Sequence, residues 1–255
     1  MTDIPAETKS HQKLRSRIQY LLLHMQTVDA ALHVMRSAIP DPSEKKVTLV
    51  NALGFDKDKY CELNHPVDEK DRIINHTRAR NSEYAIITLY RYFIEYLRNV
   101  LREIYIYKPL VVVGKAPPEY CLSYVEIVKL GSFDAISEKM VTDVFRHLEE
   151  KRNTKKFIKN MLAGIITVDE ATKTNALKYL DMRHLFIHAS GIVDQEYINK
   201  YGKELSLHVG ENLPTTYDNA RAAIEAVTLL CQVIDQELIA HGYVEPRELE
   251  RSKAG

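Results

Sequence analysis

The sequence contains no tryptophan and few residues that break helices, with nine glycines and nine prolines in 255 residues. So few turn-forming residues favour long helices over many short turns. The cysteines are odd in number and none belongs to a CxxC pair, which argues against both a disulfide framework and a cysteine-based zinc site. We therefore expect reduced thiols and a cytoplasmic protein. The three cysteines are Cys61, Cys121 and Cys231.

The chain also lacks a surplus of charge, because 35 basic residues balance 35 acidic ones. Binding of nucleic acid would therefore depend on a local cluster of cations and not on overall charge. The polar start of the chain has no apolar core of a signal peptide, and no stretch approaches the ~18 apolar residues that a membrane helix needs. The sequence predicts no association with a membrane.

What is present is helical periodicity, and it begins near the N-terminus. Apolar residues between positions 13 and 36 recur at alternating steps of four and three, which is an a/d pattern over about three heptads. Two interpretations follow. We favour a helix that packs within its own domain over a dimeric coiled coil. The apolar positions are Leu14, Ile18, Leu21, Met25, Val28, Leu32 and Met35.

Further long helices are expected over residues 82–107, 136–152, 172–189 and 216–241, the first of them capped by Asn81 or Ser82. Residues 110–113 and 205–209 have the pattern of short strands. The predicted fold is mainly all-α, a helical bundle with a long N-terminal helix and at most a small β-hairpin. We divide the chain into an N-terminal helix (1–45), a connecting segment (46–80), a helical domain (81–245) and a disordered tail (246–255).

One segment stands out chemically, the run Asp181-Met182-Arg183-His184-Leu185-Phe186-Ile187-His188 near the end of the expected helix 172–189. The guanidinium of Arg183 can grip a phosphate with two parallel hydrogen bonds. An imidazole exchanges protons near neutral pH. Together they suffice for metal-independent cleavage of RNA, in which the ribose 2′-OH attacks the phosphorus.

The spacing of these residues raises a difficulty. Positions i and i+5 of a regular helix differ by about 140° around its axis, so Arg183 and His188 do not share a face. The length of the arginine side chain covers part of the gap, and a two-fold dimer that places both motifs at one cleft would cover the rest.

The run Arg183-His184-Leu185-Phe186-Ile187-His188 resembles the Arg-polar-x-x-x-His signature of the HEPN superfamily. The text that follows, Ala189-Ser190-Gly191-Ile192-Val193-Asp194 and then a short helix, the segment LSLHVGENL and a long final helix, is similar to the tail of RiboL-PSP-like and related HEPN proteins. The helix with Phe93-Ile94-Glu95-Tyr96-Leu97 also looks like an early HEPN helix that carries an acidic residue. The likeness spans residues 81–242.

This resemblance implies an endoribonuclease that acts without a cofactor, as a homodimer whose Arg/His pairs meet at the interface, and leaves a cyclic phosphate and a 5′-hydroxyl. Arg183 would hold the phosphate and His188 would be the acid/base, while His184 and Glu95 would support the site. A toxin–antitoxin or phage-defence setting, with an antitoxin protein as a partner besides the RNA substrate, is also implied.

Three other interpretations stay open at this point. Arg183 pairs with an acidic surface neighbour while the histidines merely pack. Alternatively, Asp181, His184 and His188, at i, i+3 and i+7, bind zinc from one helical face. In the third, the chain is a non-catalytic helical module that binds a partner protein through the apolar pattern of residues 14–35, or binds RNA without cleaving it.

Overall fold

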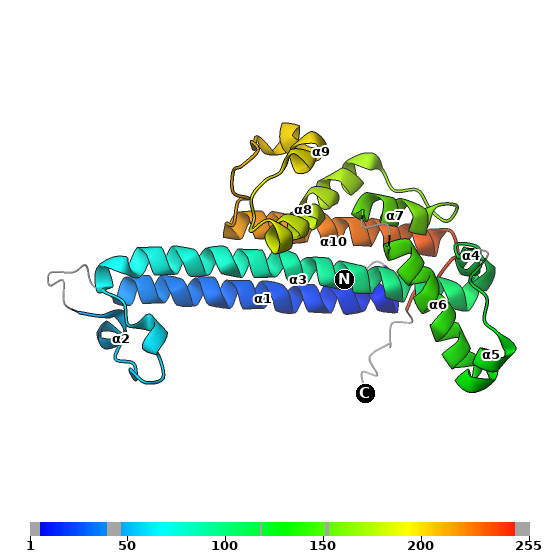
Figure 1. Cartoon of the computed structure of the whole chain (residues 1–255), viewed down its shortest axis with the longest axis horizontal. Coiled ribbons are helices and arrows are strands. Elements are labelled where there is room, and N and C mark those ends of the chain that lie inside the picture. Colours follow the sequence, from blue (N-terminus) through cyan, green and yellow to red (C-terminus); the bar gives the residue numbers. More distant parts are fainter. Residues whose placement is uncertain (1–5, 40–46, 118, 151–152, 248–255) are drawn as a thin grey trace, which may run out of the picture.

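The computed structural model describes residues 6–39, 47–117, 119–150 and 153–247, and these residues form ten α-helices, two short 3₁₀ helices and no strand (Figure 1). The predicted all-α fold is confirmed. The helices are α1 (Lys9–Ala38), α2 (Leu49–Ala52), α3 (Lys70–Tyr107), α4 (Pro109–Val113), α5 (Tyr124–Leu130), α6 (Phe133–Glu149), α7 (Thr154–Leu162), α8 (Glu170–His188), α9 (Gln195–Leu205) and α10 (Tyr217–Ala240).

The two predicted strands are wrong. Residues 110–113 belong to α4, because Pro109 occupies the first helical position, where its fixed φ favours a helix and its missing N–H costs nothing. Residue Leu205 ends α9, and Ser206 then adopts a left-handed conformation with φ 50°, which breaks any extended run. Strand-like pairing within the described residues is limited to two isolated bridges, Thr48 with Pro66 and Ile192 with Asn212.

The two longest helices, α1 and α3, lie side by side along the length of the molecule, and α10 packs against both (Figure 1). The apolar stripe of α1 is buried in this contact and joins the main core through Leu14, Ile18, Leu21 and Met25. Packing within the chain's own domain is therefore confirmed for this helix. The same burial removes the stripe of residues 14–35 as a free surface for a partner, so that part of the partner-binding interpretation is wrong.

Helix α3 begins at Lys70 and not at residue 81. Ser82 does not cap it: this side chain is buried within the helix, where its hydroxyl donates to the backbone carbonyl of Arg78. The proposed boundary between segments 46–80 and 81–245 therefore cuts through one helix. The first turns of α3 carry little apolar periodicity, and polar contacts join them to α1, as in the ion pair between Arg78 and Asp29.

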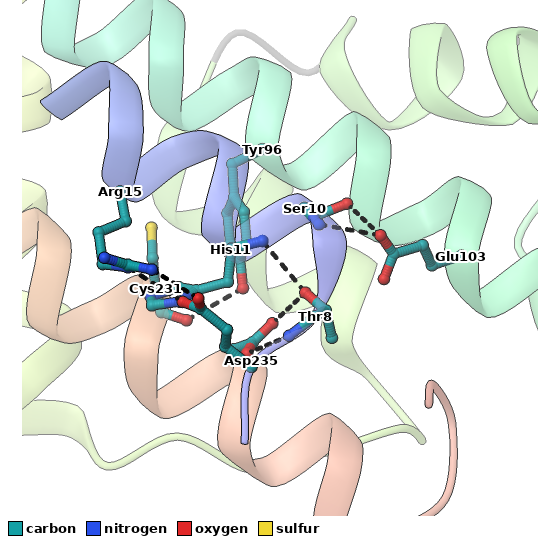
Figure 2. Close-up of polar contacts among 9 residues, drawn as sticks. Thr8, Ser10, His11, Arg15, Tyr96, Glu103, Cys231 and Asp235 are labelled. Carbon is teal, nitrogen blue, oxygen red and sulfur yellow. Dashed lines mark hydrogen bonds and ion pairs between the residues drawn. The ribbon is translucent and has the colours of Figure 1, made fainter. Parts of the chain in front are cut away.

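Polar contacts fix the start of α1 against its two neighbours (Figure 2). The hydroxyl of Ser10 donates to a carboxylate oxygen of Glu103 on α3 over 2.6 Å. On the same side of α3, the buried phenol of Tyr96 donates to the carbonyl of Cys231 on α10. These bonds tie α1, α3 and α10 into one unit, and the helix that carries the Arg/His motif, α8, packs on α3 and α10.

Two sequence expectations concern the ends and the surroundings of the chain. The predicted disordered tail, 246–255, lies outside the described residues from position 248 onward. Among the helices that the structure describes, none combines the length and the apolar character that a membrane crossing requires.

Candidate active site

Helix α8 turns the Arg/His motif toward the surface. Its apolar side chains Met182, Leu185 and Phe186 are buried in the core. Because they occupy one side of the helix, His184 and His188 are left on the exposed side, and Arg183 lies at the margin between the two. The predicted helix 172–189 is confirmed in position.

The helix ends at the motif itself. The N–H of Gly191 donates to the carbonyl of Leu185, and Gly191 has φ 79° in the left-handed region that glycine tolerates. The chain thus leaves the helix directly after His188. The expected stop at Ser190-Gly191 is confirmed, and it places His188 at an open helix end.

An open hollow of about 660 Å³ lies over this exposed side of α8. Its walls come from four parts of the chain: α3, the junction of α6 and α7, α8 itself and α9. Arg183, His184 and His188 all line it. Other polar residues in its lining are Tyr90, Glu149, Asn153, Thr154, Asp181, Asp194, Glu196, Tyr197 and Lys200.

Arg183 is held by an aromatic ring and not by a carboxylate. Its guanidinium carbon lies 5.0 Å from the centre of the Tyr90 ring on α3, a cation–π contact. Burial raises the pKa of Tyr90, while the positive charge of Arg183 acts in the opposite direction. Within the described residues Arg183 forms no hydrogen bond and no ion pair, so the interpretation that it pairs with an acidic surface neighbour is wrong.

The two histidines lie together at the surface. Their ring centres are 4.8 Å apart and the ring planes are inclined by 46°. Both side chains are exposed, and in the described part of the chain neither has a hydrogen-bond partner. The histidines therefore do not pack in the core, and their ring nitrogens are available to a ligand in the hollow.

The angular difference between Arg183 and His188 does not separate them. The hollow extends around α8 far enough to include both side chains, because Arg183 lies toward α3 while His188 lies at the helix end. A single copy of the chain therefore brings the cation and both imidazoles to one concave surface, without help from a second copy.

Asp181 is engaged by α9. One of its carboxylate oxygens accepts a hydrogen bond of 2.9 Å from the phenol of Tyr201 and lies 3.9 Å from the Nζ of Lys200. Burial, followed by the negative charge of Asp181, raises the pKa of Tyr201, which keeps its phenol protonated as the donor. The described residues include no group of three or more His, Cys, Asp or Glu side chains arranged to hold a metal ion. The zinc alternative on Asp181, His184 and His188 is thus not supported by their placement.

Glu95 lies elsewhere. Its carboxylate forms ion pairs with Lys13 and Arg17 of α1, and the hydrogen bond from Arg17 is the main cause of its lowered pKa. Tyr90 and Ile94 line the hollow, but Glu95, five residues after Tyr90, is rotated about 140° around α3 toward α1. The expectation that Glu95 supports the site is corrected by this geometry.

Most of the lining had no place in the site predicted from the sequence, and Tyr90 and Lys200 are two examples. In the sequence, Tyr90 is one of several tyrosines at helical spacing, with nothing to distinguish it from the others. Lys200 belongs to a short helix without a recognisable motif. Both come near α8 through tertiary packing, so no local signal could have identified them.

A comparison of the chain with family models, with curated proteins and with solved structures finds no match.

Proposed function

We propose that this protein is a metal-independent endoribonuclease of the HEPN type. Arg183 would bind the phosphate of the scissile bond, and His188 would transfer a proton during attack by the ribose 2′-OH. The observation that carries the proposal is the shared position of Arg183, His184 and His188 in one open hollow, with no ion pair of their own among the described residues.

The chemistry fits the contents of the hollow. Within the described part of the chain nothing accepts a hydrogen bond from the guanidinium of Arg183, and Tyr90 supports one of its faces, so a phosphate can be bound by two parallel bonds. Lys200 is a second cation in the lining, and its charge is paired with Glu196 at 2.7 Å and with Asp181 at 3.9 Å. Acid–base catalysis contributes about 10²–10⁴ in rate, and stabilisation of the developing negative charge adds to it.

The acidic residues of the lining limit which nucleic acids the hollow can bind. Four carboxylates share the hollow with the two cations, so acidic side chains outnumber basic ones there: Glu149, Asp181, Asp194 and Glu196. A long polyanion held by bulk positive charge would be repelled here. We infer that the hollow takes one phosphodiester and its two neighbouring nucleotides, in a single-stranded segment.

The assembly is part of the same proposal. We propose a homodimer in which two such hollows face a common cleft, an RNA substrate as the ligand, and a toxin–antitoxin or phage-defence role with an antitoxin as the partner. These elements rest on the resemblance of the motif and tail to HEPN proteins. The oligomeric state is open to direct measurement by light scattering.

The test is cleavage of a labelled single-stranded RNA by the purified protein in the presence of a chelator. We expect products that end in a 2′,3′-cyclic phosphate and a 5′-hydroxyl, and no cleavage where the scissile nucleotide is 2′-deoxy. Arg183→Ala and His188→Ala should each reduce the rate by at least about 100-fold while the protein stays folded.

Arg91→Ala is the matched control. Arg91 is an exposed arginine of α3 whose guanidinium lies 5.3 Å from the centre of the Tyr92 ring, so it makes the same kind of contact outside the hollow. Its replacement should leave cleavage unchanged. A folded His188→Ala protein that cleaves RNA at the wild-type rate would overturn the proposal.

A second candidate function is a non-catalytic module that binds a protein. It is favoured by the exposed apolar side chains on α5 and at the start of α6, where Tyr124 and Val128 are 89% and 78% exposed and Phe133 is 74% exposed. Capture of a partner that depends on Val128 but not on His188, combined with an absence of RNA cleavage, would support this candidate instead.

A further inference from the structure

A second pocket lies at the end of the molecule where α4, α5 and α6 meet (Figure 1). Its lining comes from residues 112–126 and 139–146, and we call it the α4–α6 pocket. Its volume is about 310 Å³, at the small end of the range of about 300–1,000 Å³ that is usual for sites of small ligands. It shares no lining residue with the hollow beside α8, so it is a separate place for a ligand.

The floor of the α4–α6 pocket is aliphatic. Val112 on α4 and Val144 on α6 are 0% and 2% exposed and belong to the main core. Val113, Ala116 and Met140 are partly buried and pack against the same core. A ligand with a short aliphatic body would cover this floor and remove apolar surface from water on both sides of the contact, which favours binding.

Five charged residues line the pocket, and three of them are already engaged within the chain. The carboxylate of Glu126 accepts hydrogen bonds from the backbone N–H and the hydroxyl of Ser123, over 2.8 and 2.7 Å, which completes the cap of α5. The Nζ of Lys139 and a carboxylate oxygen of Asp143 form an ion pair of 2.5 Å. These three charges are therefore satisfied without a ligand.

The other two charges belong to Glu119 and Arg146. Both side chains are exposed, and among the described residues neither takes part in a hydrogen bond or an ion pair. Their neighbours in the chain, Tyr120 and His147, have ring centres 5.6 Å apart, with the ring planes inclined by 72°. This ring contact joins the loop that carries Glu119 to the turn of α6 that carries Arg146. One carboxylate and one guanidinium without partners thus flank the same aliphatic floor.

From this combination we infer that the α4–α6 pocket binds a free α-amino acid with an aliphatic side chain. Arg146 binds the carboxylate of the ligand with two parallel hydrogen bonds, Glu119 accepts from its ammonium group, and the side chain covers the floor between Val112 and Val144. The two unpaired charges of opposite sign set this ligand class, because a ligand with a single charge would leave one of them without a partner. The inference goes beyond the proposed ribonuclease function and does not depend on it.

The test is isothermal titration calorimetry of the purified full chain at pH 7 with three probes of nearly the same shape. L-Leucine carries both charges, 4-methylpentanoate lacks the ammonium group, and leucinamide lacks the carboxylate. We expect leucine to bind with a Kd between about 10 μM and 1 mM. Each analogue should bind at least about 10-fold more weakly, because it loses a hydrogen bond between charged groups.

Two variants connect each charge of the ligand with its partner in the pocket. Arg146→Gln should weaken the binding of leucine by at least about 10-fold and should not weaken leucinamide further. Glu119→Gln should weaken leucine to a similar extent and should not weaken 4-methylpentanoate. Removal of a ligand group together with its partner costs little more than removal of either one, so this pattern identifies each contact separately.

Two further variants are controls for the floor and for charge. Ala116→Leu fills the floor from the side of α4 without a change of charge, so it should abolish the binding of all three probes. Arg91 is an exposed arginine of α3 outside the pocket, and Arg91→Gln should bind leucine as the wild type does. Thermal unfolding of each variant shows whether the fold is retained.

The inference is overturned if the wild type does not bind leucine at concentrations up to about 10 mM. It is equally overturned if folded Arg146→Gln or Glu119→Gln binds leucine as tightly as the wild type. Tighter binding of either analogue than of leucine would also contradict it, since the pocket would then recognise a single charge. Because the pocket and the hollow share no lining residue, each of these results leaves the ribonuclease proposal to its own test.

Discussion

Thr8 and Asp235 are 227 positions apart in the chain and share two hydrogen bonds. The backbone N–H of Thr8 donates to one carboxylate oxygen of Asp235 over 3.0 Å, and the Thr8 hydroxyl donates to the other over 2.5 Å (Figure 2). The same hydroxyl accepts from the N–H of His11 and so caps α1. This one side chain therefore starts the first long helix and anchors it to the last.

We expect Thr8→Ala to lower the free energy of unfolding by about 1–3 kcal/mol, because it removes the cap of α1 and leaves a buried carboxylate with one donor fewer. Urea denaturation followed by circular dichroism measures the loss. Ser132→Ala is the control, since Ser132 caps α6 at the surface without a long-range bond. It should cost about 1 kcal/mol or less. Equal losses in the two variants would contradict the anchoring role.

Asp235 should make stability depend on pH in a direction opposite to most carboxylates. Burial raises its pKa above 3.8, against the lowering effect of the Thr8 bonds, with His11 and Glu7 also nearby. A carboxyl whose pKa is raised by folding stabilises the protein at low pH and loses that contribution as pH rises through the folded pKa.

The measurement is the midpoint of thermal unfolding, Tm, of wild type and Asp235→Asn between pH 4 and pH 7. The amide cannot ionise, so the Tm of the wild type should fall relative to that of the variant as the pH rises. The amide also fits the two Thr8 donors less well, which lowers Tm at every pH and leaves the slope as the diagnostic quantity. A Tm difference that is constant with pH would contradict this assignment.

We expect Tyr90 to affect RNA cleavage through the face of its aromatic ring and not through its hydroxyl. Tyr90→Phe keeps the ring under the Arg183 guanidinium, whereas Tyr90→Leu removes it. Loss of a cation–π contact of about 0.5–2 kcal/mol corresponds to a roughly 2- to 30-fold weaker Arg183-dependent step. We expect kcat/KM for RNA to fall in Tyr90→Leu and to stay within about two-fold of wild type in Tyr90→Phe. An equal loss of kcat/KM in both variants would mean that the hydroxyl of Tyr90, and not its ring, is responsible.

Glu95 should contribute to stability and not to cleavage. Glu95 and Arg17 are about one-third exposed and Lys13 is 51% exposed, so solvent screening limits the combined effect of the two pairs to about 1 kcal/mol. Because its pKa is lowered in the fold, this contribution is present above about pH 4.5 and is lost as the pH falls. Glu95→Gln should therefore unfold slightly earlier at pH 7 and cleave RNA at the wild-type rate. A drop in the cleavage rate comparable to that of Arg183→Ala would show that Glu95 does contribute to the site.

Much of the helical pattern was legible in the sequence. The a/d positions of α1, the stripe of α10 and the end of α8 at Gly191 follow from local spacing and glycine chemistry, which act within a few turns of chain. Where local signals were weak or ambiguous, the prediction was wrong: residues 110–113 have the composition of a strand but continue as a helix after Pro109, and α3 extends eleven residues before Asn81 because α1 supports it.

The candidate site likewise has a part that the sequence alone predicts and a part that depends on tertiary packing. The types and spacing of Arg183, His184 and His188 were set by the sequence, and with them the chemistry that they can perform. Only the tertiary structure decided that Tyr90 lies beneath Arg183, that Lys200 joins the hollow and that Glu95 is turned toward α1. The physical reason is that side-chain chemistry and helical periodicity are local properties, whereas the residues that share a surface depend on which helices pack together and at what rotation about their axes.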